Sequence, residues 1–343
     1  INDVTETIVN GYDPVGRLVE KRYFFQDETP KTVITNTYNT LGQLISKQIG
    51  DGTYLMQTVD YEYNIRGWLT KINNPNNVSA TGDLFGMELL YNIQNTTLQN
   101  TPAFNGNISA AIWQTAQPTG TTTPVTTGIK SYKYSYDKLN RLLSGVFTGN
   151  TAQNENYSEY IDVSTMVPGT KPYDLNGNIL TLRRYGKRNN AFNTIDELTY
   201  TYDGNKLIAV DDVVATDNGG DFYEAGKKYI AGGIHEYIYD ANGNLTTDDN
   251  KKIISITYNH LNLPATINKT GGNRIVYTYD ASGNKVRQDY YINGTITKTT
   301  DFIGNFVYEN GLPSCIVYDE GRVVYANNSR TYFGEIYLKD HLG

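Results

Sequence analysis

The most regular feature of the chain is a short pattern in which apolar and polar positions alternate up to a turn and then resume. Residues 237–245 read YIYDANGNL, with aromatic rings at alternate positions before the polar stretch DANGN and an apolar Leu245 after it. A period of two is typical of a β-strand, and Asp, Asn and Gly favour tight turns. The pattern predicts a β-hairpin.

The same frame recurs along the whole chain. Each copy starts at a Tyr that is followed by Asp or Asn, four residues later by Gly or Asn, and then by an apolar residue. A shorter copy starts at Tyr202, and only Tyr91-Asn92 remains of another. The repeat-defining residues are Tyr12, Asp13, Gly16, Tyr38, Gly42, Tyr63, Gly67, Tyr136, Asp137, Tyr173, Asp174, Gly177, Tyr202, Asp203, Tyr239, Asp240, Gly243, Tyr258, Tyr279, Asp280 and Gly283.

Repetition at this spacing predicts an all-β fold of tandem antiparallel hairpins. Starts lie 26, 25 and 28 residues apart early in the chain and 19 and 21 apart from Tyr239 to Tyr279, close to the range of stacked repeats. An isolated hairpin is marginal in water, so we expect neighbouring hairpins to pair into a continuous sheet strip. Twist would curl such a strip into a spiral or shell that protects its edges.

Two polar stretches interrupt the pattern, at about 73–130 and 148–171. The first contains NNPNN, NTTLQNTPAFNGN and QPTGTTTPVTTG, but also FGMELLYN and NISAAIWQT, which have the composition of strands. We therefore expect decorated sheet here rather than a linker between domains.

Composition supports sheets and narrows the function. The chain has 343 residues with 30 Tyr, 10 Phe, 32 Gly and a single Cys, and its net charge is −7. Without a basic patch, binding of nucleic acid through phosphate contacts is disfavoured. No stretch approaches the roughly 20 apolar residues that span a bilayer. The chain starts at Ile1 without an initiator Met, so we expect a processed or partial chain.

The tandem units resemble the YD repeats of RHS-repeat proteins, and the C-terminus strengthens the resemblance. Residues 307–343 resemble the entry to the RHS-associated core domain, with its signature at Asp340, His341, Leu342 and Gly343. The resemblance implies a repeat region at 1–306, a core-domain entry at 307–343 and a longer parent chain. It also implies a strip that spirals into part of a hollow shell, as in bacterial Rhs and polymorphic toxins, the toxin-complex cocoon and the teneurin barrel.

In toxin members of this family the shell houses a C-terminal effector, which an aspartyl autoprotease can release. The residues of that cleavage follow the signature, so no catalytic residue is transferred to this chain. The resemblance implies a secreted or surface-exposed bacterial protein. We expect no enzyme activity in this segment, no cofactor and no metal.

Local chemistry offers alternatives to a purely structural role. The turn Asp240-Ala-Asn242-Gly-Asn244 superficially resembles a calcium loop, but it lacks the Gly at position six and the Glu at position twelve of an EF-hand. The histidines His235, His260 and His341 lack metal-ligand spacing, and Cys315 is typical of a small packed hydrophobe. His341 is interpreted as a packing or turn residue, with a catalytic role as the alternative.

The sequence leaves three alternative functions open. The first is a shell segment that encapsulates or presents its own C-terminal effector, or that joins a partner or secretion-system protein. The second is a cell-surface adhesion module in which exposed tyrosine rows and loops bind glycan or protein. The third, a free-standing carbohydrate-active enzyme, has the least support.

Overall fold

The structure is a computed structural model that describes residues 6–25, 32–50, 55–78, 82–117, 125–149, 154–214, 221–225, 235–325 and 332–342. Within these ranges it consists of antiparallel strands joined by turns, together with the 3-10 helix η2 (Thr270–Gly272). The prediction of an all-β fold built from tandem antiparallel hairpins is confirmed.

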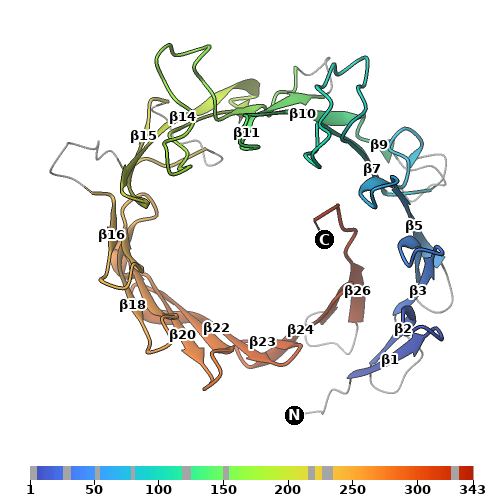
Figure 1. Cartoon of the computed structure of the whole chain (residues 1–343). Coiled ribbons are helices and arrows are strands. Elements are labelled where there is room, and N and C mark those ends of the chain that lie inside the picture. The colour runs from blue at the N-terminus through green and yellow to red at the C-terminus, as the bar shows by residue number, and fades with distance from the viewer. Residues whose placement is uncertain are drawn as a thin grey trace. The chain divides into compact units, whose positions relative to one another are not determined.

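The chain divides into two compact units, residues 1–158 with 338–343 and residues 159–337. In the first unit the strands follow one another in chain order (Figure 1). The exception is the short β9 (Val125–Thr126), which lies off this path and pairs with β8 (Ala110–Gln117), so that β8 also pairs with β10 (Lys130–Tyr136). Its strands are β1 (Glu6–Tyr12), β2 (Leu18–Phe25), β3 (Thr32–Tyr38), β4 (Leu44–Gly50), β5 (Leu55–Tyr63), β6 (Leu69–Ile72), β7 (Phe85–Leu90), β8 (Ala110–Gln117), β9 (Val125–Thr126), β10 (Lys130–Tyr136) and β11 (Leu142–Thr148).

The second unit contains β12 (Glu159–Tyr160), β13 (Thr181–Arg188), β14 (Ala191–Asp203) and β15 (Lys206–Asp212), which pair in chain order. A sheet of 11 strands follows, also in chain order. Its strands are β16 (Tyr237–Tyr239), β17 (Leu245–Asp248), β18 (Ile253–Tyr258), β19 (Pro264–Lys269), β20 (Arg274–Tyr279), β21 (Lys285–Ile292), β22 (Thr295–Ile303), β23 (Phe306–Glu309), β24 (Leu312–Tyr318), β25 (Gly321–Tyr325) and β26 (Tyr332–Ile336).

The strands predicted inside the first interruption are present. FGMELL forms β7 and AAIWQTAQ forms β8, and the two strands pair along their length. The predicted hairpin at Tyr173 is reduced to an isolated bridge between Tyr173 and Ile179.

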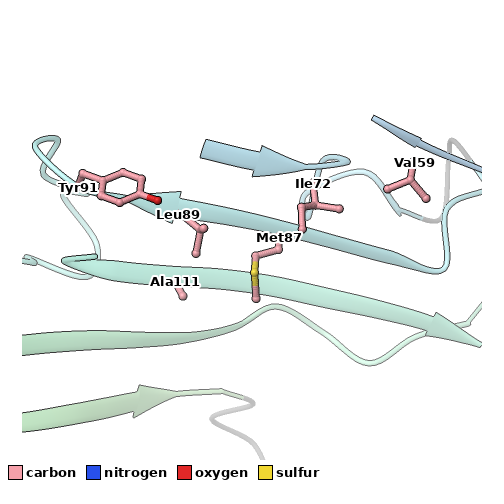
Figure 2. Close-up of a cluster of buried hydrophobic side chains, with 6 residues drawn as sticks. All are labelled: Val59, Ile72, Met87, Leu89, Tyr91 and Ala111. Carbon is pink, nitrogen blue, oxygen red and sulfur yellow. The ribbon is translucent and has the colours of Figure 1, made fainter. Parts of the chain in front are cut away.

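A cluster of buried hydrophobic side chains lies on β5, β6, β7 and β8 (Figure 2). Met87 and Leu89 alternate along β7 on one face, while Leu90 of β7 points to the opposite face and packs with Ala110 and Ile112. Both faces are covered here because Trp68 and Ile108 pack on one side and Leu98 on the other. The residues of the first cluster are Val59, Ile72, Met87, Leu89, Tyr91 and Ala111.

Candidate functional site

The repeated turn has one geometry, which its sequence explains. In the copy at Tyr239, the Asp240 Oδ1 atom accepts hydrogen bonds from the backbone N–H groups of Asn242 and Asn244, at 2.9 and 2.8 Å. The Gly243 N–H donates to the Asp240 carbonyl, and Gly243 has a φ of 84°. This is a three-residue hairpin loop in which Gly takes the left-handed position.

Other copies build the same loop. The Asp or Asn after the tyrosine accepts backbone N–H groups two and four residues later, and the fourth residue after the tyrosine has a positive φ. At Asn140 and Asn262, Asn replaces Gly with φ values of 63° and 56°. The acceptors are Asp13, Asn39, Asn64, Asp137, Asp174, Asp240, Asn259 and Asp280.

A β-bulge accompanies the repeat tyrosine in every copy whose two strands form a ladder. Ile238 lies opposite Thr247, whereas the next residue, Tyr239, lies opposite Leu245, so the return strand carries one extra residue. The same shift occurs at Tyr12, Tyr38, Tyr63, Tyr136, Tyr202, Tyr258 and Tyr279. A bulge bends the strand and re-aims the neighbouring side chain.

In eight copies the tyrosine hydroxyl donates to a backbone carbonyl of the preceding segment of the chain. Tyr239 lies opposite Leu245 in its own hairpin, and the Leu245 carbonyl in turn accepts the hydroxyl of Tyr258 at 2.6 Å. The corresponding donors and acceptors are Tyr38 to Leu18, Tyr63 to Leu44, Tyr91 to Leu69, Tyr136 to Ile108, Tyr202 to Ile179, Tyr239 to Leu207 and Tyr279 to Pro264, at 2.8–3.0 Å.

Sequence reasoning placed the tyrosines on a packed face but missed this bond between hairpins. The decayed copy at Tyr91 and the short copy at Tyr202 both keep it, although their turns differ from the common loop. The detectable signal was that Tyr, rather than Phe, starts every copy. A ring alone packs, whereas a hydroxyl donor also fixes the register of the next hairpin.

The pKa shifts keep the turn carboxylates ionised and the repeat tyrosines protonated, which are the states that their hydrogen bonds require. Hydrogen bonds from the side chain and backbone of Asn244 hold the pKa of Asp240 below its ordinary value, and Asn284 does the same for the pKa of Asp280. Burial raises the pKa of Tyr91, Tyr136, Tyr202 and Tyr239. The carboxylates therefore stay charged acceptors and the phenols stay donors at neutral pH.

The turn geometry favours the hairpin over the calcium alternative. The Asp240 Oδ1 atom accepts two backbone N–H groups, and Oδ2 accepts the Asn244 amide at 3.0 Å. Both oxygens are thus used within the loop. In the ranges that the structure describes, no group of three or more His, Cys, Asp and Glu residues could hold a metal ion.

A buried carboxylate replaces strand pairing where the second unit passes from β15 to β16. Glu236 is fully buried; its backbone N–H donates to the Ile208 carbonyl, and its Oε2 atom accepts the Val210 N–H and the Asn250 amide, at 2.9 and 2.8 Å. Burial raises the pKa of Glu236. The strip is interrupted here because a side-chain oxygen takes the place of a ladder carbonyl. Nothing in the surrounding sequence, GIHEYIYD, identifies this role.

The remaining predicted residues are dispersed. Asp340 Oδ1 accepts the Leu342 N–H at 2.8 Å, an Asx turn like those of the repeats, while Leu342 is exposed. His341 lies beside this turn with a buried Nδ1 atom, and Gly343 lies outside the described residues. Cys315 is half-buried on β24, and burial raises the pKa of its thiol, which disfavours a reactive thiolate.

Fold and site together define an all-β protein of tandem hairpins, in which the tyrosines of eight copies bond to a carbonyl of the preceding segment. No family model and no curated protein matches the sequence. Solved structures with a similar chain path include the crystal structure of TcdB2-TccC3-Cdc42, at 12% identity and a TM-score of 0.44, over 98% of this chain and 15% of that one. The Photorhabdus luminescens Tc holotoxin pore with the TccC3-D651A mutation matches at 12% identity and a TM-score of 0.44, over 95% of this chain and 14% of that one.

This chain thus spans about a seventh of the length of these toxin chains. Among the described residues, no helix is long and apolar enough to cross a membrane.

Proposed function

We propose that this chain is a wall segment of a secreted or surface-exposed RHS-repeat protein, and that the wall encapsulates or presents an effector on the same polypeptide. The observation that carries the proposal is the chain of tyrosine-to-carbonyl bonds from hairpin to hairpin. A catalytic centre needs one constellation of side chains, whereas a wall needs the same connection at many units. We call the tyrosine-to-carbonyl hydrogen bond the joint.

The division of the chain belongs to the same proposal. Residues 1–306 supply repeat wall, and residues 307–343 lead into a core domain from which the effector continues. The effector is the partner expected inside, with a secretion-system protein as a further one at the rim. The polar and aromatic character of the tyrosine-rich faces supports contact with an unfolded polypeptide, because Tyr offers both a ring and a hydroxyl.

The test uses the complete natural polypeptide that contains residues 1–343. If the wall encloses an effector, limited proteolysis will leave the effector intact for longer than the same effector expressed alone. Mass spectrometry of the fragments over time measures this protection. Equal digestion of the effector in both forms, or a natural polypeptide that carries nothing after Gly343, would contradict the proposal.

A matched pair of variants tests whether the joint is needed to protect the effector from proteolysis. Tyr258→Phe with Tyr279→Phe removes two hydroxyl donors and should speed digestion of the effector. Tyr290→Phe in the same sheet is the control, because the Tyr290 hydroxyl makes no hydrogen bond within the part of the chain that the structure describes. Equal effects of both changes would mean that the joint does not hold the wall.

A further inference from the structure

The loop between β7 and β8 creates an open groove that the repeat architecture does not require. Residues 101–107 and the end of β10 border this open groove, whose volume of about 540 Å³ lies within the range of roughly 300–1,000 Å³ typical of ligand pockets. Its lining is Thr101, Pro102, Ala103, Phe104, Asn105, Asn107, Tyr134, Ser135, Tyr136 and Asn140. This lining contains no Asp, Glu, Lys, Arg or His side chain.

The groove combines aromatic surface with amides. Phe104 is 64% exposed and lines the groove, so its ring face is accessible to a ligand. Beside it, the amides of Asn105 and Asn107 both donate to the Asn140 Oδ1 atom, at 2.5 and 3.4 Å. The Asn140 amide group and the Asn107 Oδ1 atom make no hydrogen bond to residues in the described ranges, so a donor and an acceptor remain available.

The loop is held in place before any ligand arrives. Asn100 is fully buried, and its amide donates to the Ile93 carbonyl and to the Ser109 hydroxyl, at 2.9 and 2.7 Å. The Ala103 N–H donates to the Tyr91 carbonyl, so the insertion is tied to the end of β7. A preformed site avoids the entropy cost of ordering a loop on binding.

The tip of the loop is fixed by a second set of contacts. Gly106 has a φ of 100°, and a Cβ atom there would lie 3.3 Å from the Trp68 ring. Arg66 lies over the same ring, 5.1 Å from its centroid, and donates to the Phe104 carbonyl at 2.9 Å. The Arg66 guanidinium therefore points at a backbone oxygen of the loop and is absent from the lining.

We propose that this groove binds a neutral oligosaccharide. A sugar ring presents an apolar C–H face that packs on an aromatic ring, and its hydroxyls both donate and accept hydrogen bonds, as the free amide atoms do. An uncharged lining gives no compensation for burying a phosphate, sulfate or carboxylate, which disfavours charged ligands. The inference is independent of the wall function and concerns one place in the first unit.

The experiment titrates the purified chain with cellohexaose, laminarihexaose and maltohexaose, and measures saturation-transfer NMR and calorimetric affinity. We expect at least one of these probes to bind. Phe104→Ala should weaken that binding about tenfold, because an aromatic contact is worth about one such factor, whereas Phe104→Trp should retain it. Since Phe104 is exposed, its replacement leaves the fold intact.

Ile93→Ala provides a matched control. Ile93 is also 64% exposed and belongs to the same insertion, but it does not line the groove. Failure of all three probes to bind, binding that Phe104→Ala leaves unchanged, or equal weakening by Ile93→Ala would each overturn the proposal. Binding of a heparin hexasaccharide or of reduced, unfolded casein without any neutral probe would also overturn it, in favour of an anionic or polypeptide ligand.

Discussion

Two stretches of hairpins in this chain are held together in different ways. In β5–β8, the sheet is covered on both faces and carries a buried apolar cluster. In β16–β22, none of the apolar side chains that the structure describes is buried. Both stretches nevertheless contain the tyrosine-to-carbonyl bond, at Tyr91 in the first and at Tyr258 and Tyr279 in the second.

The difference shows what the repeat supplies by itself. Turn, bulge and hydroxyl bond specify which strands pair and in which register, and they do so without a dry core. Apolar cover on both faces arises where an insertion packs on the sheet, as residues 92–109 do over β7 and β8 through Leu98 and Ile108. Stability should therefore be concentrated in the interrupted stretch and spread thinly over the regular one.

The largest predicted effect separates the two stretches by core packing. Ile72→Ala empties a site that is 1% exposed and should lower the free energy of unfolding by about 2–5 kcal/mol. Ile275→Ala on β20, where the side chain is half-buried, should cost less than half as much. Urea unfolding followed by circular dichroism measures both.

Ile65→Ala is the control for this experiment, because Ile65 is fully exposed at a turn and its loss should change stability by less than about 0.5 kcal/mol. Equal losses for Ile72 and Ile275 would show that the regular stretch also relies on apolar burial.

The second prediction concerns the hydroxyl bond. Tyr91→Phe leaves the Leu69 carbonyl without its donor beside the buried cluster and should cost about 1–3 kcal/mol. Tyr279→Phe should cost about 0.5–1.5 kcal/mol, because water can replace the donor to Pro264 on an open face. Tyr290→Phe should leave the free energy of unfolding unchanged. Urea unfolding measures all three variants. A larger loss at Tyr279 than at Tyr91 would mean that the joint is stronger where no core assists it.

The sequence predicted the features that depend on neighbouring residues and missed those that depend on contacts between distant segments. The hairpins were predictable because Tyr-Asp, the positive-φ Gly and the following apolar residue are local signals, and β7 and β8 were predictable from their composition. The hydroxyl acceptors were not, because a backbone carbonyl of the preceding hairpin leaves no mark in the sequence. Glu236 and Asn250 were missed for a similar reason, since their roles depend on residues brought close only by the fold.

The groove at Phe104 was likewise beyond sequence reasoning. The stretch NTPAFNGN was recognised as a polar interruption with turn residues. That its amides meet Asn140, which belongs to a regular turn, is set by the pairing of β8 with β10.

The third prediction compares a strained glycine with an unstrained one. Gly243→Ala should cost about 1 kcal/mol, because its φ of 84° disfavours a Cβ even though no atom lies within 4 Å. Gly243→Asn should cost less, since Asn140 and Asn262 occupy the same position of other copies. Gly334→Ala, also without neighbours but without a positive φ, should be neutral. Equal melting temperatures for the wild type and Gly243→Ala would contradict the turn assignment.

The smallest predicted effect is the pH dependence of stability. Its sign should differ between the turn carboxylate Asp240 and the buried carboxylate Glu236. Hydrogen bonds lower the pKa of Asp240 in the folded chain, so its stabilising effect is present above the unfolded pKa and is lost as the pH falls through the folded value. Burial raises the pKa of Glu236, so the corresponding stability is present below the unfolded pKa and is lost as the pH rises through the folded value.

The two carboxylates should therefore give opposite slopes when urea midpoints are measured between about pH 3 and pH 7. Asp240→Asn should flatten the loss toward acid while it preserves the turn, because Asn fills this position in the copies at Asn39, Asn64 and Asn259. Glu236→Gln should flatten the decline toward neutral pH, because Gln does not ionise. Its amide oxygen can still accept the hydrogen bond from the Val210 N–H. Slopes of the same sign would mean that the Glu236 carboxylate is solvated like a carboxylate in a turn, and that its burial between β15 and β16 does not disfavour its charged form.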